Sequence, residues 1–283
     1  MKMKIRKYTQ GITHTALSFL LALGVSSAVS TSTLAAEGAA GADAIPLPIV
    51  VSPYKDRIPE TAANVAAGRA LYERSCIWCH GINGEGKGPV AWFLARDTAP
   101  HPRDFTYGVY KFRSTLSGEM PLDEDLFRTI TRGIPGYMPG FRGYSTEDRW
   151  RLVYYIKSLS PDFKGAEPEA IKVVGTPIPA NGASIHRGYQ VYKKFKCWEC
   201  HGGGGAGDGK KAPTLKDDWG FRLPPRDLRR PSAFKNGSTP ADLYRTIMAG
   251  LDGGAMPSYS DFFEGSEQDV WHLINYINSL AAE

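Results

Sequence analysis

Two short motifs place thiol and imidazole side chains where they could bind one cofactor covalently and also coordinate it. Each is Cys-x-x-Cys followed at once by His: Cys76, Cys79 and His80, and Cys197, Cys200 and His201. Two thiols three positions apart on a helical turn can add to the two vinyl groups of a haem, and the next imidazole can then ligate its iron. A lone Cys-x-x-Cys also serves zinc or thiol redox chemistry. Two copies that both end in His predict two c-type haems, with His80 and His201 on the irons.

Each motif lies in a longer segment that occurs twice. Four pairs of positions are 121 residues apart: Cys76 and Cys197, Trp150 and Trp271, Tyr155 and Tyr276, and Leu159 and Leu280. Between them, Asp125-Leu-Phe-Arg-Thr-Ile130 matches Asp242-Leu-Tyr-Arg-Thr-Ile247, and Arg103-Asp104 matches Arg226-Asp227. An ordered series of this kind indicates a duplication. We therefore predict two domains, residues 60–160 and 183–283, joined by a Pro-rich linker at 161–182.

The apolar periodicity within each unit is helical. In the first unit it appears before the haem motif, in the middle and at the end: Val65, Leu71 and Tyr72; Leu126, Phe127 and Ile130; and Trp150, Val153, Ile156 and Leu159. Ser145-x-x-Asp148 and Ser266-x-x-Asp269 are capping-box variants that predict where the last helix of each unit begins. No segment alternates as a strand would. The predicted fold class is all-α, with a small helical bundle around each haem.

The sixth iron ligand is sought among the methionines. Residues after the first 36 include four: Met120, Met138, Met248 and Met256. Met138 and Met256 both precede Pro and both follow the repeated middle helix, so we predict that they are the sixth ligands. Met248 aligns with a Thr and is expected in the core. Met120 has no counterpart, and it remains with His101 as an alternative ligand of the first haem.

The duplicated unit resembles the class I c-type cytochromes, and the chain resembles dihaem proteins made of two fused class I domains. The similar first-helix positions and their aromatic partners are Gly68-x-x-x-Tyr72 with Tyr155, and Gly188-x-x-x-Tyr192 with Tyr276. In that family the Gly allows the last helix to cross the first closely. The resemblance also implies that the carbonyls of Pro89 and Pro213 accept a hydrogen bond from the ligand histidines. Trp78, inside the first motif, is expected to cover the porphyrin.

The N-terminus predicts export. Residues 1–36 combine a basic start, a short apolar run and a small-residue stretch around Ala35, as a secretory signal peptide does. The alternative is an uncleaved membrane anchor, although the run is short for a bilayer span. Residues 37–59 form a Pro-rich arm. We expect a periplasmic or otherwise exported protein with no further transmembrane segment.

Charge excludes one class of partner. Removing the signal takes Lys+Arg from 34 to 30 against 29 acidic residues, so the formal net charge falls from +5 to +1. Each haem adds two propionates, and nucleic-acid binding therefore has no electrostatic support.

The leading functional hypothesis is an electron carrier with no catalytic residues. It would exchange single electrons with redox protein partners, either an exported oxidoreductase, of which it could be a subunit, or a membrane respiratory complex. The alternative is a dihaem peroxidase-like enzyme, which requires one displaceable axial ligand.

Overall fold

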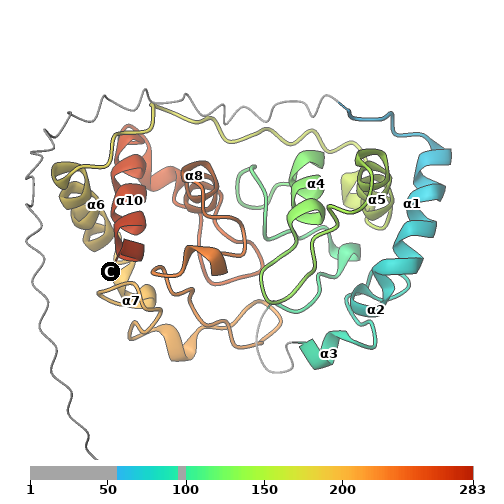
Figure 1. The fold of residues 1–283 in the computed structure, drawn as a ribbon, viewed down its shortest axis with the longest axis horizontal. Coiled ribbons are helices and arrows are strands. Elements are labelled where there is room, and N and C mark those ends of the chain that lie inside the picture. The colour runs from blue at the N-terminus through green and yellow to red at the C-terminus, as the bar shows by residue number, and fades with distance from the viewer. Residues whose placement is uncertain (1–55, 95–99, 283) are drawn as a thin grey trace, which may run out of the picture. The chain divides into compact units, whose positions relative to one another are not determined.

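Two pairs of crossed helices form the framework of the computed structural model, which describes residues 56–94 and 100–282. In the first half, α1 (Ala62–Ser75) packs against α5 (Thr146–Ser158) (Figure 1). In the second half, α6 (Gly182–Lys194) packs against α10 (Gln268–Ser279). The middle helix of each half, α4 (Asp123–Arg132) or α8 (Pro240–Ala249), packs against the last helix of that half. The predicted duplication thus has the same helix arrangement in both copies.

The remaining elements are short. The short α-helices are α2 (Ile77–His80), α3 (Ala91–Leu94), α7 (Trp198–His201) and α9 (Ser260–Phe263). The 3-10 turns are Phe105–Tyr107, Pro161–Phe163, Ala212–Thr214, Pro231–Ala233 and Leu280–Ala282. The described residues contain no strand, only two isolated bridges, so the all-α prediction is confirmed. Within that same part of the chain, no helix is long and apolar enough to span a bilayer.

Side-chain caps set several helix starts. Ser145 accepts a hydrogen bond from the Asp148 N–H at 3.1 Å, so the predicted start of α5 is confirmed. The same prediction at Ser266 is wrong. There α10 begins at Gln268 after Glu267, without a side-chain cap, and the Ser266 hydroxyl donates to the Phe263 carbonyl instead.

Glycine permits the close crossing of the first and last helices. A Cβ at Gly68 would lie 2.0 Å from the Arg151 carbonyl oxygen, and one at Gly188 would lie 2.0 Å from that of His272. Beside each crossing, tyrosine rings pack with centroids 5.0 Å apart for Tyr72 and Tyr155. The equivalent pair in the second half is 5.1 Å apart. Any side chain at these glycines must push two backbones apart.

We therefore expect Gly188→Ala to lower the free energy of unfolding by about 1–3 kcal/mol, as overpacking against rigid backbone does. The matched control is Gly182→Ala at the start of the same helix, where an added Cβ meets nothing within 4 Å. That change should stay within about 0.5 kcal/mol of wild type. Chemical denaturation of the holoprotein measures both, and equal effects would show that the crossing tolerates a methyl group.

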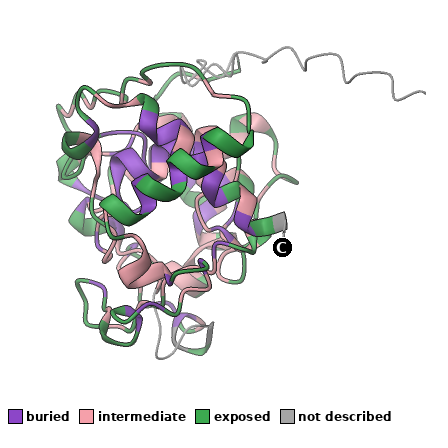
Figure 2. Cartoon of the chain, turned by 90° about the vertical axis from the view of Figure 1, so that its left-hand side faces the viewer, coloured by how far each residue is buried: buried purple, intermediate pink, exposed green. Residues whose placement is uncertain are grey.

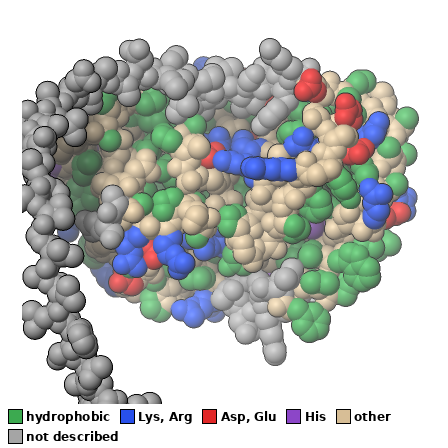
Figure 3. Space-filling view, viewed as in Figure 1, with side chains coloured by type: hydrophobic (Ala, Val, Ile, Leu, Met, Phe, Trp, Pro, Cys, Tyr) green, Lys and Arg blue, Asp and Glu red, His purple; other side chains and the backbone are tan. Residues whose placement is uncertain are grey.

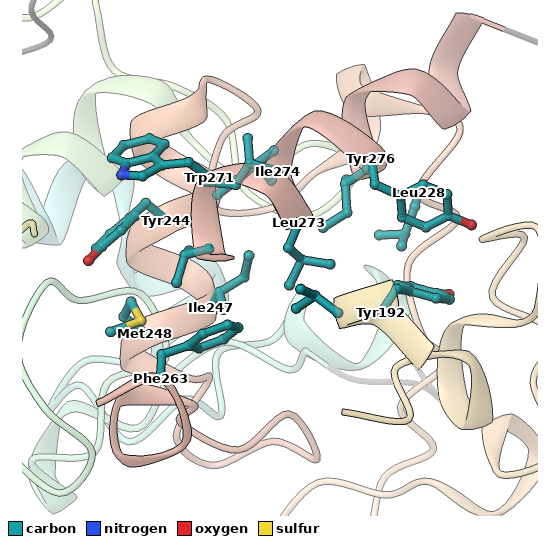
Figure 4. Close-up of a cluster of buried hydrophobic side chains, with 14 of the residues drawn as sticks. Tyr192, Leu228, Tyr244, Ile247, Met248, Phe263, Trp271, Leu273, Ile274 and Tyr276 are labelled. Atoms are coloured by element: carbon teal, nitrogen blue, oxygen red, sulfur yellow. The ribbon is translucent and has the colours of Figure 1, made fainter. Parts of the chain in front are cut away.

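Each half has its own hydrophobic core. In the first, Trp150 and Tyr154 of α5 are fully buried and pack with Phe127 of α4. In the second, Trp271 packs on Tyr244, and Met248 lies in the same cluster with Phe263 (Figure 4). Figure 2 faces the helices of the second half, along which both buried and exposed residues appear. The expectation that Met248 is core is confirmed by its 4% exposure.

Buried polar contacts join the two halves, which belong to one compact unit, Ala44–Glu283. The Arg113 side chain is fully buried, donates to the Ala249 carbonyl at 2.8 Å and pairs with Asp252 at 2.8 Å. Arg132 forms a second ion pair across the halves, with Asp242 at 2.8 Å. Removing one partner of such a pair would leave a buried charge uncompensated, which is destabilising.

The backbone of the segment predicted as a linker, 161–182, forms hydrogen bonds with both halves. The Ile171 N–H donates to the Ser114 carbonyl at 2.7 Å in the first half. In the second half, the Trp271 indole N–H donates to the Val174 carbonyl at 3.2 Å. The segment therefore packs against both halves rather than extending into solvent.

Two candidate haem sites

The haem motifs fold as single helical turns that bring both thiols and the imidazole to one place. The His80 N–H donates to the Cys76 carbonyl at 2.9 Å, and the His201 N–H donates to that of Cys197, also at 2.9 Å. All four cysteines are free thiols rather than disulfides. Burial raises the pKa of Cys76 to about 12 and that of Cys197 to about 11. These sites favour an uncharged sulfur, and a thioether is one.

A backbone carbonyl sets the tautomer of each histidine. Nδ1 of His80 lies 3.1 Å from the Arg103 carbonyl oxygen, and Nδ1 of His201 lies 3.1 Å from that of Arg226. A carbonyl only accepts, so Nδ1 carries the proton and Nε2 keeps its lone pair for a metal. Burial lowers the pKa of both rings, that of His80 to about 4, which keeps them neutral.

The prediction that the carbonyls of Pro89 and Pro213 accept from these histidines is therefore wrong. The carbonyl comes from the Pro-Arg-Asp stretch that occurs in both halves, as that of Arg103 in the first and of Arg226 in the second. The histidine and the carbonyl are 23 residues apart in the first half and 25 in the second. The path of so long a connection is not encoded in local periodicity.

Each motif opens into a largely apolar cavity. The first cavity, of ≈160 Å³, is lined by Cys76, Cys79 and His80 and also by Met138. The second, of ≈220 Å³, is lined by Cys197, Cys200 and His201 and also by Met256. Two thiols, a neutral imidazole and a thioether in an apolar cavity are the donor set of a His/Met c-type haem, so the residues fit the predicted group.

The two methionines sit in matching tight loops. The Ile134 N–H donates to the Met138 carbonyl at 2.8 Å, and the Leu251 N–H donates to the Met256 carbonyl at 2.9 Å. Met120 instead packs against the first core and does not line the cavity. His101 does line it, with its ring stacked on Phe221 of the second half at 3.6 Å.

Trp78 does not fill the place expected for it. Its side chain is 57% exposed, and Ile82 and Phe93 nearby in the sequence are also exposed. Figure 3 shows hydrophobic side chains gathered on the surface over α2 and α3. Because Trp78 lies between the two cysteines on the outer side of α2, it cannot also cover the cavity.

Sequence reasoning missed the residues that lie between the two cavities. Lys111 and Phe112 line both of them. A signal was available, because Tyr110-Lys-Phe-Arg-Ser-Thr115 matches Phe234-Lys-Asn-Gly-Ser-Thr239. In the sequence, the basic residues of this repeat look like ordinary charged residues of a protein surface. Only the fold places it between the haem sites.

Comparison with known proteins agrees with this geometry. The sequence pattern of the family described as "Cytochrome C oxidase, cbb3-type, subunit III" matches twice, at residues 63–156 and 183–277. No curated protein matches the chain significantly. A solved chain of the Kuenenia stuttgartiensis reducing HAO-like protein complex Kustc0457/Kustc0458 is 38% identical, with a TM-score of 0.71. That alignment covers 79% of this chain and 98% of the other. With two tandem cytochrome c domains, this chain belongs to the family of cytochrome c oxidase, cbb3-type, subunit III, whose domains bind haem c covalently and transfer electrons.

Proposed function

We propose that this chain is an exported dihaem cytochrome c that passes single electrons between redox protein partners. The observation that carries the proposal is the same donor set at both cavities: two thiols, a neutral histidine and a loop methionine. When bound, a haem iron supplies a one-electron couple between its ferric and ferrous states. The chain's part would be to ligate each iron through a histidine and a methionine and to exclude water with the apolar walls of each cavity.

In this proposal, His80 with Met138 would ligate the first iron, and His201 with Met256 would ligate the second. The domains are residues 60–160 and 183–283, with 161–182 between them. The match of the family to each half supports this division. So does the presence of a separate core in each half.

Export rests on the predicted signal peptide at 1–36. This segment, together with most of the arm at 37–59, lies outside the described residues. Cytochrome c domains are typically exported, and this supports the periplasm as the location.

The structural relative bears on the partners. The similar chain comes from an HAO-like protein complex. Its 38% identity and near-complete coverage support a role for this chain as a subunit, or as a donor or acceptor, of an exported oxidoreductase. A membrane respiratory complex is the other partner that we propose.

Peroxide turnover separates an electron carrier from a peroxidase. If both irons hold two protein ligands, the reduced protein should exchange electrons rapidly with small redox mediators. Its turnover of hydrogen peroxide should remain at the level of a simple carrier. Stopped-flow reoxidation with peroxide, with and without a reduced donor, measures this. Rapid turnover would favour the dihaem peroxidase and would mean that one axial ligand is displaceable.

A further inference from the structure

The segment between the two cavities is buried and fixed to both halves. Tyr110, Lys111, Phe112 and Arg113 are each at most 9% exposed, although two of them are basic. Arg113 binds Ala249 and Asp252 of the second half, as described above. These contacts of Arg113 also fix its near neighbour Lys111 at the interface between the two halves.

Lys111 is a buried cation that faces both cavities. It is 6% exposed and lines the first and the second cavity. A Cβ at Gly254 would lie 3.2 Å from its Nζ atom, so the ammonium lies beside the loop that carries Met256. Within the described residues, no hydrogen bond or ion pair to this ammonium is found; the carboxylates acting on it, Asp217 and Asp218, do so only from a distance. A buried ammonium without a close anion is strongly destabilising.

Other cations converge on the same region. Arg103 lines the first cavity, and Arg226 and Lys235 line the second. Lys235 holds the position equivalent to Lys111 and lies over the Tyr137 ring of the first half at 4.2 Å. Burial, followed by repulsion from Arg226 and from Lys111, lowers the pKa of Lys235 to about 7. Burial, followed by repulsion from Arg103, lowers the pKa of Lys111 to about 8. The positive charge of this cluster would attract an anion into the cavities.

The first cavity has a second group that lacks a partner. The Tyr110 hydroxyl is buried, lines this cavity and has no hydrogen-bond partner among the residues that the structure describes. A carboxylate that entered the cavity could accept a hydrogen bond from this hydroxyl and could also pair with a cation of the same lining, Arg103 or Lys111. Each haem of the proposed function brings two carboxylates, its propionates.

We propose that Lys111 is a shared positioning residue, whose ammonium binds propionate carboxylates of the haems in both cavities and so raises both reduction potentials. The proposal rests on the proposed function, because it requires a haem in each cavity. Gaining an electron makes a haem more negative, and a cation at its edge favours that state. One side chain placed between two haems should therefore act on both.

The test is a potentiometric titration of both haems in the purified holoprotein. Lys111→Met keeps an unbranched side chain only one atom shorter but removes its charge. At a fixed ambient potential, the ferrous-to-ferric ratio of both haems should fall several-fold. Lys111→Arg should restore most of it. The matched control Lys164→Met, at an exposed lysine, should leave both ratios unchanged. A shift of one haem only, or of neither, would overturn the proposal.

Two further measurements complete the design. If Lys111→Met yields no holoprotein, Lys111→Gln, neutral and polar, is titrated in its place with the same two-haem criterion. Wild type is also titrated with increasing acetate at constant ionic strength. A saturable shift would mean that a free anion, not a propionate, occupies this position, and would overturn the proposal. Haem content is read separately: fewer than two haems in wild type refutes the proposed function, whereas two haems with unmoved potentials refute only the role of Lys111.

Discussion

Replacing Cys76 and Cys79 together by alanine should produce a protein that retains one covalent haem instead of two. The thioether bonds hold a c-type haem even when its axial bonds break. Without the two thiols, the first cavity, of ≈160 Å³, has only non-covalent contacts for its haem. Haem that resists acid–acetone extraction, quantified per chain and checked by intact mass, should fall by half.

The matched control is the equivalent change in the second motif, Cys197→Ala with Cys200→Ala. It should also leave one haem, and the remaining haem should differ spectroscopically from the one left by the first variant. Combining all four changes should remove covalent haem completely. A wild-type protein that carries zinc or two disulfides and no haem would contradict both the proposed function and the interpretation of the motifs.

Met138→Ala and Met256→Ala should each open one iron to external ligands. The thioether is a neutral, soft donor that favours ferrous iron, so its loss lowers the potential of that haem. The drop should be a measurable part of the roughly 0.8 V range that axial ligands cover. Each variant should lose half of the weak red-edge absorption of ferric iron bound to Met. It should also bind one equivalent of carbon monoxide or cyanide while both haems stay attached.

Two other methionines serve as controls for these variants. Met120→Ala should leave both irons closed, because Met120 packs against the first core and does not line the cavity. Met248→Ala should destabilise the second core by about 2–5 kcal/mol, as large-to-small core changes do, again without opening an iron. If Met120→Ala opens a haem and Met138→Ala does not, the alignment of the repeats is misleading for the first loop. If neither change affects the first haem, His101 becomes its ligand, and the peroxidase alternative gains weight.

Local patterns account for most of what the sequence predicted correctly. The helices around Leu126 and Trp150 follow from apolar spacing, and the start of α5 follows from Ser145, because each depends on residues within a turn or two. The capping prediction at Ser266 failed although Ser266-x-x-Asp269 has the same pattern as Ser145-x-x-Asp148, because the preceding turn differs between the two halves. There the hydroxyl donates to the Phe263 carbonyl, and the helix begins without it.

The sequence by itself determined the covalent chemistry and the duplication, because a haem motif joins residues that are adjacent in the chain, and a repeat is a comparison of the chain with itself. Only the tertiary structure decided what surrounds the cofactor sites. The carbonyls that accept from His80 and His201 lie 23 and 25 residues further along the chain. The placement of Lys111 depends on Arg113, which binds a carbonyl 136 residues away. Contacts at such separations depend on how loops close and how the halves meet, and no local period or motif encodes either.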